Sequence, residues 1–129
     1  MLGTPDALLI DGQWRAEASG GSLTLIEPAT EQPWHSVPAA GLGEIDEAAT
    51  AAARAFREAP WANASPRDRA NALFRLAALI REQVEDLAVL ESRNVGKPIA
   101  DSRDEVLAGA RCMEYYAGAV STFGGETPP

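Results

Sequence analysis

One cysteine and one histidine are the side chains of this chain best suited to nucleophilic or acid–base chemistry. Cys112 lies between Arg111 and Met113 in an expected helix, far from any helix N-terminus that would favour its thiolate. We therefore expect a buried structural cysteine rather than a nucleophile. His35 lies in a strand-like segment with no residue spaced to form a catalytic pair or a metal site with it. We expect it to be a half-exposed structural histidine.

The remaining polar and aromatic residues supply no complete site either. Asp101, Asp104 and Glu105 fall near the start of an expected helix, where acids complement the helix dipole. No phosphate-binding glycine loop occurs in a strand–turn–helix setting. Three tryptophans stand beside turns without a basic groove, which favours packing anchors over a stacking platform: Trp14, Trp34 and Trp61. The residues alone therefore predict no catalytic site.

Composition limits the classes of partner. The 129 residues carry a net charge of −8 and a hydrophobic fraction of 46%, which fits one modest domain or a piece of a larger one. No basic stripe with aromatic neighbours is present, which argues against nucleic acid and anionic lipid. No apolar run approaches the roughly 18 residues of a membrane span. The start of the chain lacks signal-peptide features, and one cysteine forms no internal disulfide, so we expect a cytoplasmic protein.

The first third of the chain predicts short strands and turns. Residues 8–10 and 13–15 flank Asp11-Gly12, which readily forms a type I′ hairpin turn. Residues 22–26 alternate polar and apolar side chains, as a strand does, and Pro28 then forces a bend. Residues 33–37 are a shorter strand candidate. A helix follows over about residues 44–58, and its expected buried edge is Ile45, Ala49, Ala52 and Phe56.

A long helix and a third helix complete the predicted elements. Ser65-Pro66-Arg67-Asp68 predicts the start of the long helix, because serine caps, proline suits the first position and the acid completes a capping box. An apolar stripe then runs along roughly 27 residues: Leu73, Leu76, Ala77, Ile80, Val84, Leu87 and Leu90. After Gly96-Lys97-Pro98 the third helix reaches about Thr122, with one predicted face: Val106, Ala110, Met113, Ala117 and Val120. Gly124-Gly125 is expected to end it, and residues 127–129 to form an extended tail.

An ordered series of short motifs resembles the aldehyde dehydrogenase superfamily over essentially the whole chain. The motifs are Leu9-Ile10-Asp11-Gly12-Gln13-Trp14, Ile26-Glu27-Pro28-Ala29-Thr30, Ala55-Phe56, Pro60-Trp61, Ser65-Pro66 with Arg69, Leu90-Glu91-Ser92, Gly96-Lys97-Pro98, Tyr115-Tyr116-Ala117-Gly118 and Gly125-Glu126-Thr127. The series matches about the first quarter of a family member. The resemblance implies an α/β fold, with residues 1–129 as the N-terminal portion of a Rossmann-like cofactor-binding domain: a short hairpin and strand region followed by three helices.

The activity implied by the resemblance is oxidation of an aldehyde to a carboxylic acid with NAD or NADP. In the family a cysteine thiolate attacks the carbonyl, hydride passes to the nicotinamide, and a glutamate-activated water hydrolyses the thioester. Those residues and the cofactor loop lie beyond the end of this sequence, and Cys112 is similar to a helix position instead. We therefore expect no cofactor and no activity for this chain alone. The full-length parent is expected to be a homo-oligomer, either a dimer or a tetramer.

Two lesser sites are implied by the resemblance. Many relatives hold a monovalent cation with backbone oxygens at the end of the second strand and an aspartate shortly before Gly-Lys-Pro. The matching positions here are Leu25, Ile26 and Asn94, although asparagine brings no charge. Positions matching the wall of the aldehyde tunnel are Asp104, Glu105 and Ala108. Acids there suit an aldehyde with an amino group at its far end. Residues 91–98 together with these acids are most similar to the aminobutyraldehyde branch.

Two interpretations of the function remain open. The chain is either the N-terminal piece of an aldehyde dehydrogenase or a truncated, non-enzymatic module that docks through its apolar helix faces. A free-standing enzyme that uses Cys112 fails on geometry and on the missing cofactor elements. Coding sequence that continues after Pro129 favours the first interpretation, and a stop codon favours the second.

Overall fold

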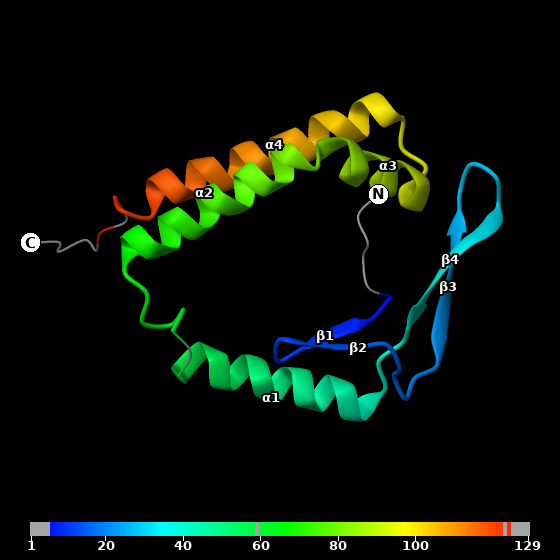
Figure 1. Ribbon diagram of the computed structural model, residues 1–129, viewed down its shortest axis with the longest axis horizontal. Coiled ribbons are helices and arrows are strands. Elements are labelled where there is room, and N and C mark those ends of the chain that lie inside the picture. Colours follow the sequence, from blue (N-terminus) through cyan, green and yellow to red (C-terminus); the bar gives the residue numbers. More distant parts are fainter. Residues whose placement is uncertain (1–5, 59, 123, 125–129) are drawn as a thin grey trace, which may run out of the picture. The chain divides into compact units, whose positions relative to one another are not determined.

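The computed structural model describes residues 6–58, 60–122 and 124, which form two compact units (Figure 1). The first unit contains the chain through Asn63 together with Glu91–Gly96, and the second contains Ala64–Leu90 and the chain from Lys97 onward. Each unit is described by itself. No helix within the described residues is long and apolar enough to cross a membrane.

The first hairpin of unit one joins β1 (Leu8–Ile10) to β2 (Gln13–Arg15), as predicted. Asp11 and Gly12 have φ angles of 52° and 74°, the two successive positive values that a type I′ turn requires. Leu9 pairs with Trp14 across the hairpin, and both side chains are exposed. The apolar residue that the hairpin buries is Ile10, which is 5% exposed.

The second hairpin joins β3 (Ser22–Glu27) to β4 (Gln32–Pro38) in an antiparallel pair. Both strands match the predicted segments within a residue or two. The register shifts between Leu25 and Ile26, because Leu25 lies opposite His35 whereas Ile26 lies opposite Pro33. Trp34 is therefore the extra residue of a β-bulge, which bends a strand and increases its twist.

Helix α1 (Leu42–Glu58) follows the second hairpin and contacts β1. Its predicted buried edge is wrong: Ile45 is 55% exposed and Phe56 is 84% exposed, and the buried residue is Ala51. The periodicity detected an apolar stripe correctly, but the described part of the chain offers no partner for that stripe. The face that meets the hairpin instead uses small alanines, which let the two elements approach closely.

Helix α2 (Pro66–Glu82) begins unit two with the predicted cap. The Ser65 Oγ accepts a hydrogen bond from the Asp68 N–H at 3.2 Å and donates one to the Asp68 carboxylate at 2.7 Å. Pro66 occupies the first position, where its missing N–H costs nothing. The start of this helix was therefore fully predictable from four residues.

The predicted long helix is divided in two, so the chain has four described helices where three were expected. Gln83 (φ −111°, ψ 19°) separates α2 from α3 (Val84–Val95), and its N–H is shared between the carbonyls of Leu79 and Ile80. The interruption lasts one residue, and the Leu87 N–H bonds to the Gln83 carbonyl at 3.0 Å. No glycine or proline marks the break, so the apolar pattern runs through it.

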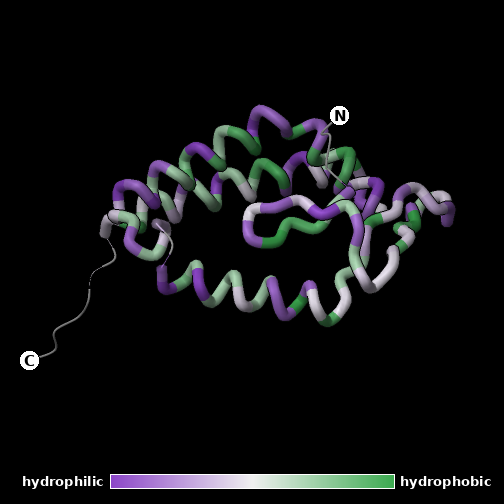
Figure 2. Tube along the Cα trace, turned by 60° about the horizontal axis from the view of Figure 1, so that its bottom comes forward, coloured by the Kyte–Doolittle hydropathy of each residue, from purple (hydrophilic) through white to green (hydrophobic). Residues whose placement is uncertain are grey.

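Helix α4 (Ile99–Ala119) lies beside α2 along its length (Figure 1). Its predicted inner face is confirmed, since Ala110 and Ala117 are at most 1% exposed. Ala77 of α2 is equally buried, whereas Leu76 of the predicted stripe is 43% exposed. Figure 2 shows that each of these helices carries both hydrophobic and hydrophilic residues along its length. The seam between α2 and α4 is thus made by small residues.

Two small hairpins and four helices are consistent with part of an α/β domain, as predicted. The helix expected to reach Thr122 ends at Ala119. The predicted tail over residues 127–129 and the second glycine of the expected stop at Gly125 lie outside the described residues.

Candidate functional site

The predicted cation-site residues lie in unit one, on β3 and on the last turn of α3. Leu25 is half-buried and Ile26 is 48% exposed, on either side of the register shift. Pro33, opposite Ile26, has no N–H to donate to the ladder. Asn94 is exposed on α3. The described residues contain no group of three His, Cys, Asp or Glu side chains that could hold a metal ion.

The neighbours of Asn94 tie the last turn of α3 to the end of β3. The Arg93 Nε donates to the Glu27 carboxylate at 3.4 Å, and the guanidinium carbon lies 5.0 Å from the centre of the Trp34 ring. Gly96 has φ 76°, and a Cβ there would stand 3.0 Å from the Pro28 Cβ. The structure therefore brings the segment that carries Asn94 against the strand that carries Ile26.

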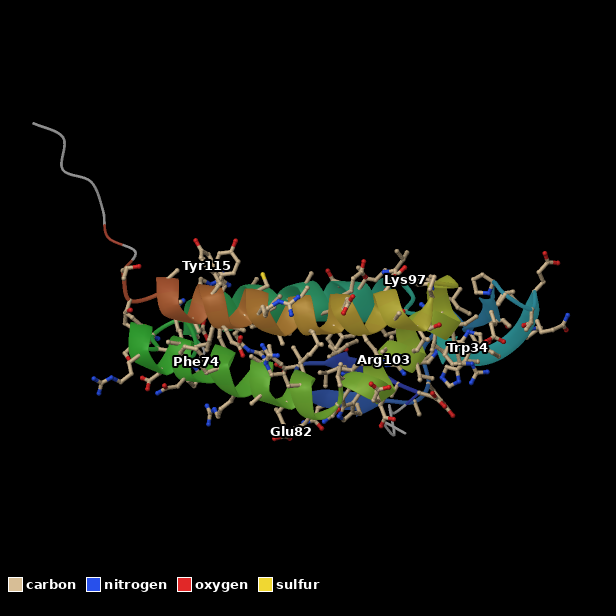
Figure 3. All side chains as sticks on the ribbon, turned by 90° about the horizontal axis from the view of Figure 1, so that it is seen from above. Trp34, Phe74, Glu82, Lys97, Arg103 and Tyr115 are labelled. Atoms are coloured by element: carbon tan, nitrogen blue, oxygen red, sulfur yellow. The ribbon has the colours of Figure 1, made fainter. Side chains whose placement is uncertain are left out.

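The predicted tunnel residues lie on α4 in unit two. Ala108 follows Asp104 by about one helical turn and shares its face, whereas Glu105 lies about 100° further round. The Lys97 ammonium forms an ion pair with the Glu105 carboxylate. Lys97 and Tyr115 are labelled in Figure 3, where Tyr115 lies on the side of α4 away from α2. Asp104 is thus an exposed acid, and Glu105 already has a basic partner.

Cys112 is exposed, so the prediction of a buried cysteine is wrong. It lies two positions after Ala110, about 200° round the helix from the face that packs on α2. Its mid-helix position still offers no feature that would make it a nucleophile. No catalytic residue is therefore assigned within the described chain.

His35 and Trp34 have structural roles, as predicted. Their rings stack with centroids 5.3 Å apart, and the His35 Nε2 lies 2.6 Å from an Asp6 oxygen. The His35 side chain is 33% exposed, which confirms a half-exposed histidine. Trp34 is half-buried and contacts His35 and Arg93, whereas Trp14 and Trp61 are 59% and 52% exposed.

A carboxylate that sequence reasoning missed joins the turn between the two hairpins to the start of α1. Glu44 accepts from the Ser19 hydroxyl at 2.6 Å, the Ser19 N–H at 2.9 Å and the Gly41 N–H at 2.9 Å. The hydrogen bonds from Ser19, and then those from the helix N-terminus, lower the pKa of Glu44 to about 2. The three-residue spacing from Gly41 to Glu44 is the capping-box signal that could have identified it.

Two arginines hold the first hairpin on α1. Arg54 donates to both carboxylate oxygens of Asp11 at 2.6 Å, and Arg15 forms a two-point pair with Glu47. The hydrogen bond from Arg15 lowers the pKa of Glu47. These partners are 43 and 32 residues apart, so no local pattern predicts them.

Comparison with known proteins places this arrangement in a family. The model of the aldehyde dehydrogenase family matches residues 14–129. Hydroxyisobutyraldehyde dehydrogenase from Mycolicibacterium austroafricanum is 36% identical over 124 residues, which cover 96% of this chain and 24% of that protein.

Solved structures agree with the sequence comparison. The gamma-glutamyl-gamma-aminobutyraldehyde dehydrogenase from Burkholderia cenocepacia superposes with a TM-score of 0.91 at 35% identity, covering 99% of this chain and 26% of that one. An NAD-dependent aldehyde dehydrogenase from Sinorhizobium meliloti gives 0.87 at 33% identity, covering 93% and 24%. The chain spans about a quarter of the length of the relatives it matches. On this match along almost its entire length, the chain belongs to the aldehyde dehydrogenase family.

Proposed function

We propose that residues 1–129 are the N-terminal portion of the cofactor-binding domain of an NAD(P)-dependent aldehyde dehydrogenase, which oxidises an aldehyde to a carboxylic acid. One observation carries the proposal: the family match runs over residues 14–129 while the chain spans about a quarter of its relatives. The catalytic cysteine, the glutamate and the cofactor loop would come from sequence beyond Pro129. The parent would use NAD or NADP, and the name of the Sinorhizobium meliloti relative describes that enzyme as NAD-dependent.

The exposure of large apolar side chains supports the proposal. Leu42 and Phe56 of α1 are 87% and 84% exposed, and Leu79 of α2 is 52% exposed. Surfaces of this kind mark interaction sites in soluble proteins. In the proposed parent, later residues of the same polypeptide would cover them. The parent would be a cytoplasmic homo-oligomer.

The test is to read the gene beyond Pro129 and to assay what it encodes. If the frame continues, we expect the purified full-length product to reduce NAD or NADP in the presence of an aldehyde, and the 129-residue chain to bind neither cofactor. Saturable NAD binding by the 129-residue chain, or turnover that is lost with Cys112→Ser, would overturn the assignment of the machinery to later residues. A full-length product that oxidises no aldehyde would refute the activity itself.

For the substrate we propose an aldehyde with an amino group at its far end. Asp104 is an exposed carboxylate on the proposed tunnel face, with Glu105 and Ala108 beside it. The Burkholderia cenocepacia relative is, by its name, a gamma-glutamyl-gamma-aminobutyraldehyde dehydrogenase. The Lys97 ion pair neutralises Glu105, so Asp104 is the acid left to meet a substrate ammonium.

Paired kinetics test the substrate class in the full-length enzyme. Asp104→Asn should lower kcat/KM for an ω-aminoaldehyde by up to about fivefold, which corresponds to the ~1 kcal/mol of one exposed ion pair, and leave an uncharged aldehyde of equal length unchanged. Asp101→Asn, which removes the same charge from the same helix, is the matched control. Equal losses on both substrates would refute the role of Asp104.

A second candidate function rests on the same exposed faces. A truncated module could dock on other proteins through the α1 stripe that contains Ile45 and Phe56, without any catalysis. A stop codon directly after Pro129, together with an Ile45→Asp variant that abolishes binding to a copurifying full-length subunit, would favour this module over the enzyme piece.

A further inference from the structure

The junction between β3 and the last turn of α3 differs in charge from a cation site. A monovalent cation requires several oxygen acceptors and is helped by a neighbouring negative charge. The family resemblance supplies Leu25, Ile26 and Asn94 for this purpose. Asn94 is neutral and exposed, so it brings an oxygen but no charge.

The nearest acid on the strand is already neutralised. Glu27 directly follows Ile26, and its side chain is only 22% exposed. One oxygen accepts from Arg93 at 3.4 Å, and the other accepts from the Thr30 hydroxyl at 3.0 Å. Each oxygen of the Glu27 carboxylate therefore already accepts a hydrogen bond, and the Arg93 guanidinium compensates its negative charge.

A fixed positive charge stands at the same junction. The Arg93 guanidinium lies 5.0 Å from the Trp34 ring centre, within the range of a cation–π interaction. The indole Nε1 of Trp34 is buried and has no hydrogen-bond partner within the described residues. That unpaired group is a donor and not an acceptor, so it repels a cation. The side chains present here do not fit the predicted ion.

We propose that the Arg93 guanidinium takes the structural place of a bound monovalent cation, so that this chain binds neither K⁺ nor Na⁺ at Leu25, Ile26 and Asn94. Arg93 is a positioning residue: it joins Glu27 of β3 and Trp34 of β4 to the α3 turn that ends at Gly96. The inference concerns this junction and not catalysis, so it stands or falls independently of the proposed dehydrogenase activity.

Direct ion binding tests the proposal. Sodium NMR line widths are measured with the full-length protein that contains this chain, with KCl as competitor and tetramethylammonium chloride holding the ionic strength constant. We expect no K⁺-competable broadening for the native chain. The double variant Arg93→Leu/Asn94→Asp introduces the acid and removes the resident cation, so it should show the K⁺-competable broadening that the native chain lacks. Asn94→Asp alone should gain little, because Arg93 remains to pair with the new carboxylate.

Matched variants separate the local effect from overall charge. Arg57→Leu/Asn63→Asp makes the same charge change elsewhere in unit one and should gain no ion binding. K⁺-competable broadening in the native chain would overturn the proposal. So would a double variant that gains no binding, or a control pair that gains as much as the double variant.

Hydrogen exchange provides a readout of the positioning role. The Gly96 N–H bonds to the Ser92 carbonyl at 2.9 Å, in the turn that Arg93 ties down. Arg93→Leu should speed exchange of the Gly96 amide several-fold, and Arg93→Lys, which keeps the charge over Trp34, should restore part of the protection. Equal exchange in the native chain and Arg93→Leu would contradict the positioning role.

Discussion

Replacing Gly96 with alanine tests whether the last turn of α3 packs on β3. Gly96 has φ 76°, a left-handed conformation that costs an alanine roughly 1–2 kcal/mol. Alanine also reduces the conformational entropy of the unfolded chain, which offsets about 0.4–1 kcal/mol of this cost. A Cβ at Gly96 would also lie 3.0 Å from the Pro28 Cβ, which is closer than the ~3.5–4.0 Å of an ordinary carbon contact. Relief of that contact adds about 1 kcal/mol, as in other overpacked sites, so we expect Gly96→Ala to destabilise the protein by ~2 kcal/mol.

Alanine variants at two other glycines separate the backbone cost of a positive φ angle from the cost of the close contact with Pro28. Gly12 has nearly the same φ, 74°, but no atom lies within 4 Å of the place that a Cβ would take, so Gly12→Ala should show the backbone cost alone, about 1 kcal/mol. Gly109, inside α4, has ordinary φ and open space, and Gly109→Ala should stabilise by about 0.5–1 kcal/mol. Urea unfolding followed by circular dichroism measures all three, with an unchanged slope as the condition for comparison. Equal losses at Gly96 and Gly12 would refute the contact between α3 and β3.

Three further outcomes are expected. Ser65→Ala removes the α2 cap and should reduce the free energy of unfolding by about 1 kcal/mol, whereas a change below the error of urea unfolding would mean that the cap contributes nothing. Ala110→Leu should lower the free energy of unfolding by about 1–3 kcal/mol, because it overpacks the fully buried α2–α4 seam. Gly109→Ala adds a methyl group in open space next to it and should not lower the free energy of unfolding. Similar melting points for the two variants would disprove the seam. The pKa of Glu44 is lowered to about 2, so the stability that its ionised carboxylate contributes is complete above the ordinary pKa near 4.5 and is lost as the pH falls towards 2. Glu44→Gln should therefore flatten that part of the pH–stability curve. An unaltered curve would argue against the hydrogen bonds to Ser19 and Gly41.

Local chemistry predicted the turns and caps correctly. Asp11-Gly12 formed its type I′ turn and Ser65-Pro66 its helix start, because both depend on residues within one turn of each other. The inner face of α4 was equally predictable, since its alanines recur at helical spacing and a neighbouring helix of the same chain covers them.

The features that the sequence did not predict depend on contacts between residues far apart in the chain. On α1 the periodic stripe was present, but Ile45 and Phe56 are exposed because nothing in the described chain packs on them. At the cation-site positions the resemblance identified Asn94, but the contact that defines the junction joins Arg93 to Glu27 across 66 residues. No spacing rule relates residues at such a separation. The pairing of Arg93 with Glu27 at this junction could therefore be identified only from the folded structure.

The distribution of buried residues bears on what the chain needs in order to be stable. Within the described part of unit two the fully buried side chains are small: Ala77, Ala88, Ser102, Ala110 and Ala117. Burying one methyl contributes about 0.8 kcal/mol, whereas ordering each residue costs roughly 1–2 kcal/mol of backbone entropy. Several larger side chains, which would contribute ~1.5–3 kcal/mol each on full burial, are about half exposed: Phe74, Leu76 and Leu79 of α2 are 47%, 43% and 52% exposed. An α/β domain covers such faces with further layers of structure. This imbalance supports the proposal that later residues of a longer polypeptide complete the domain.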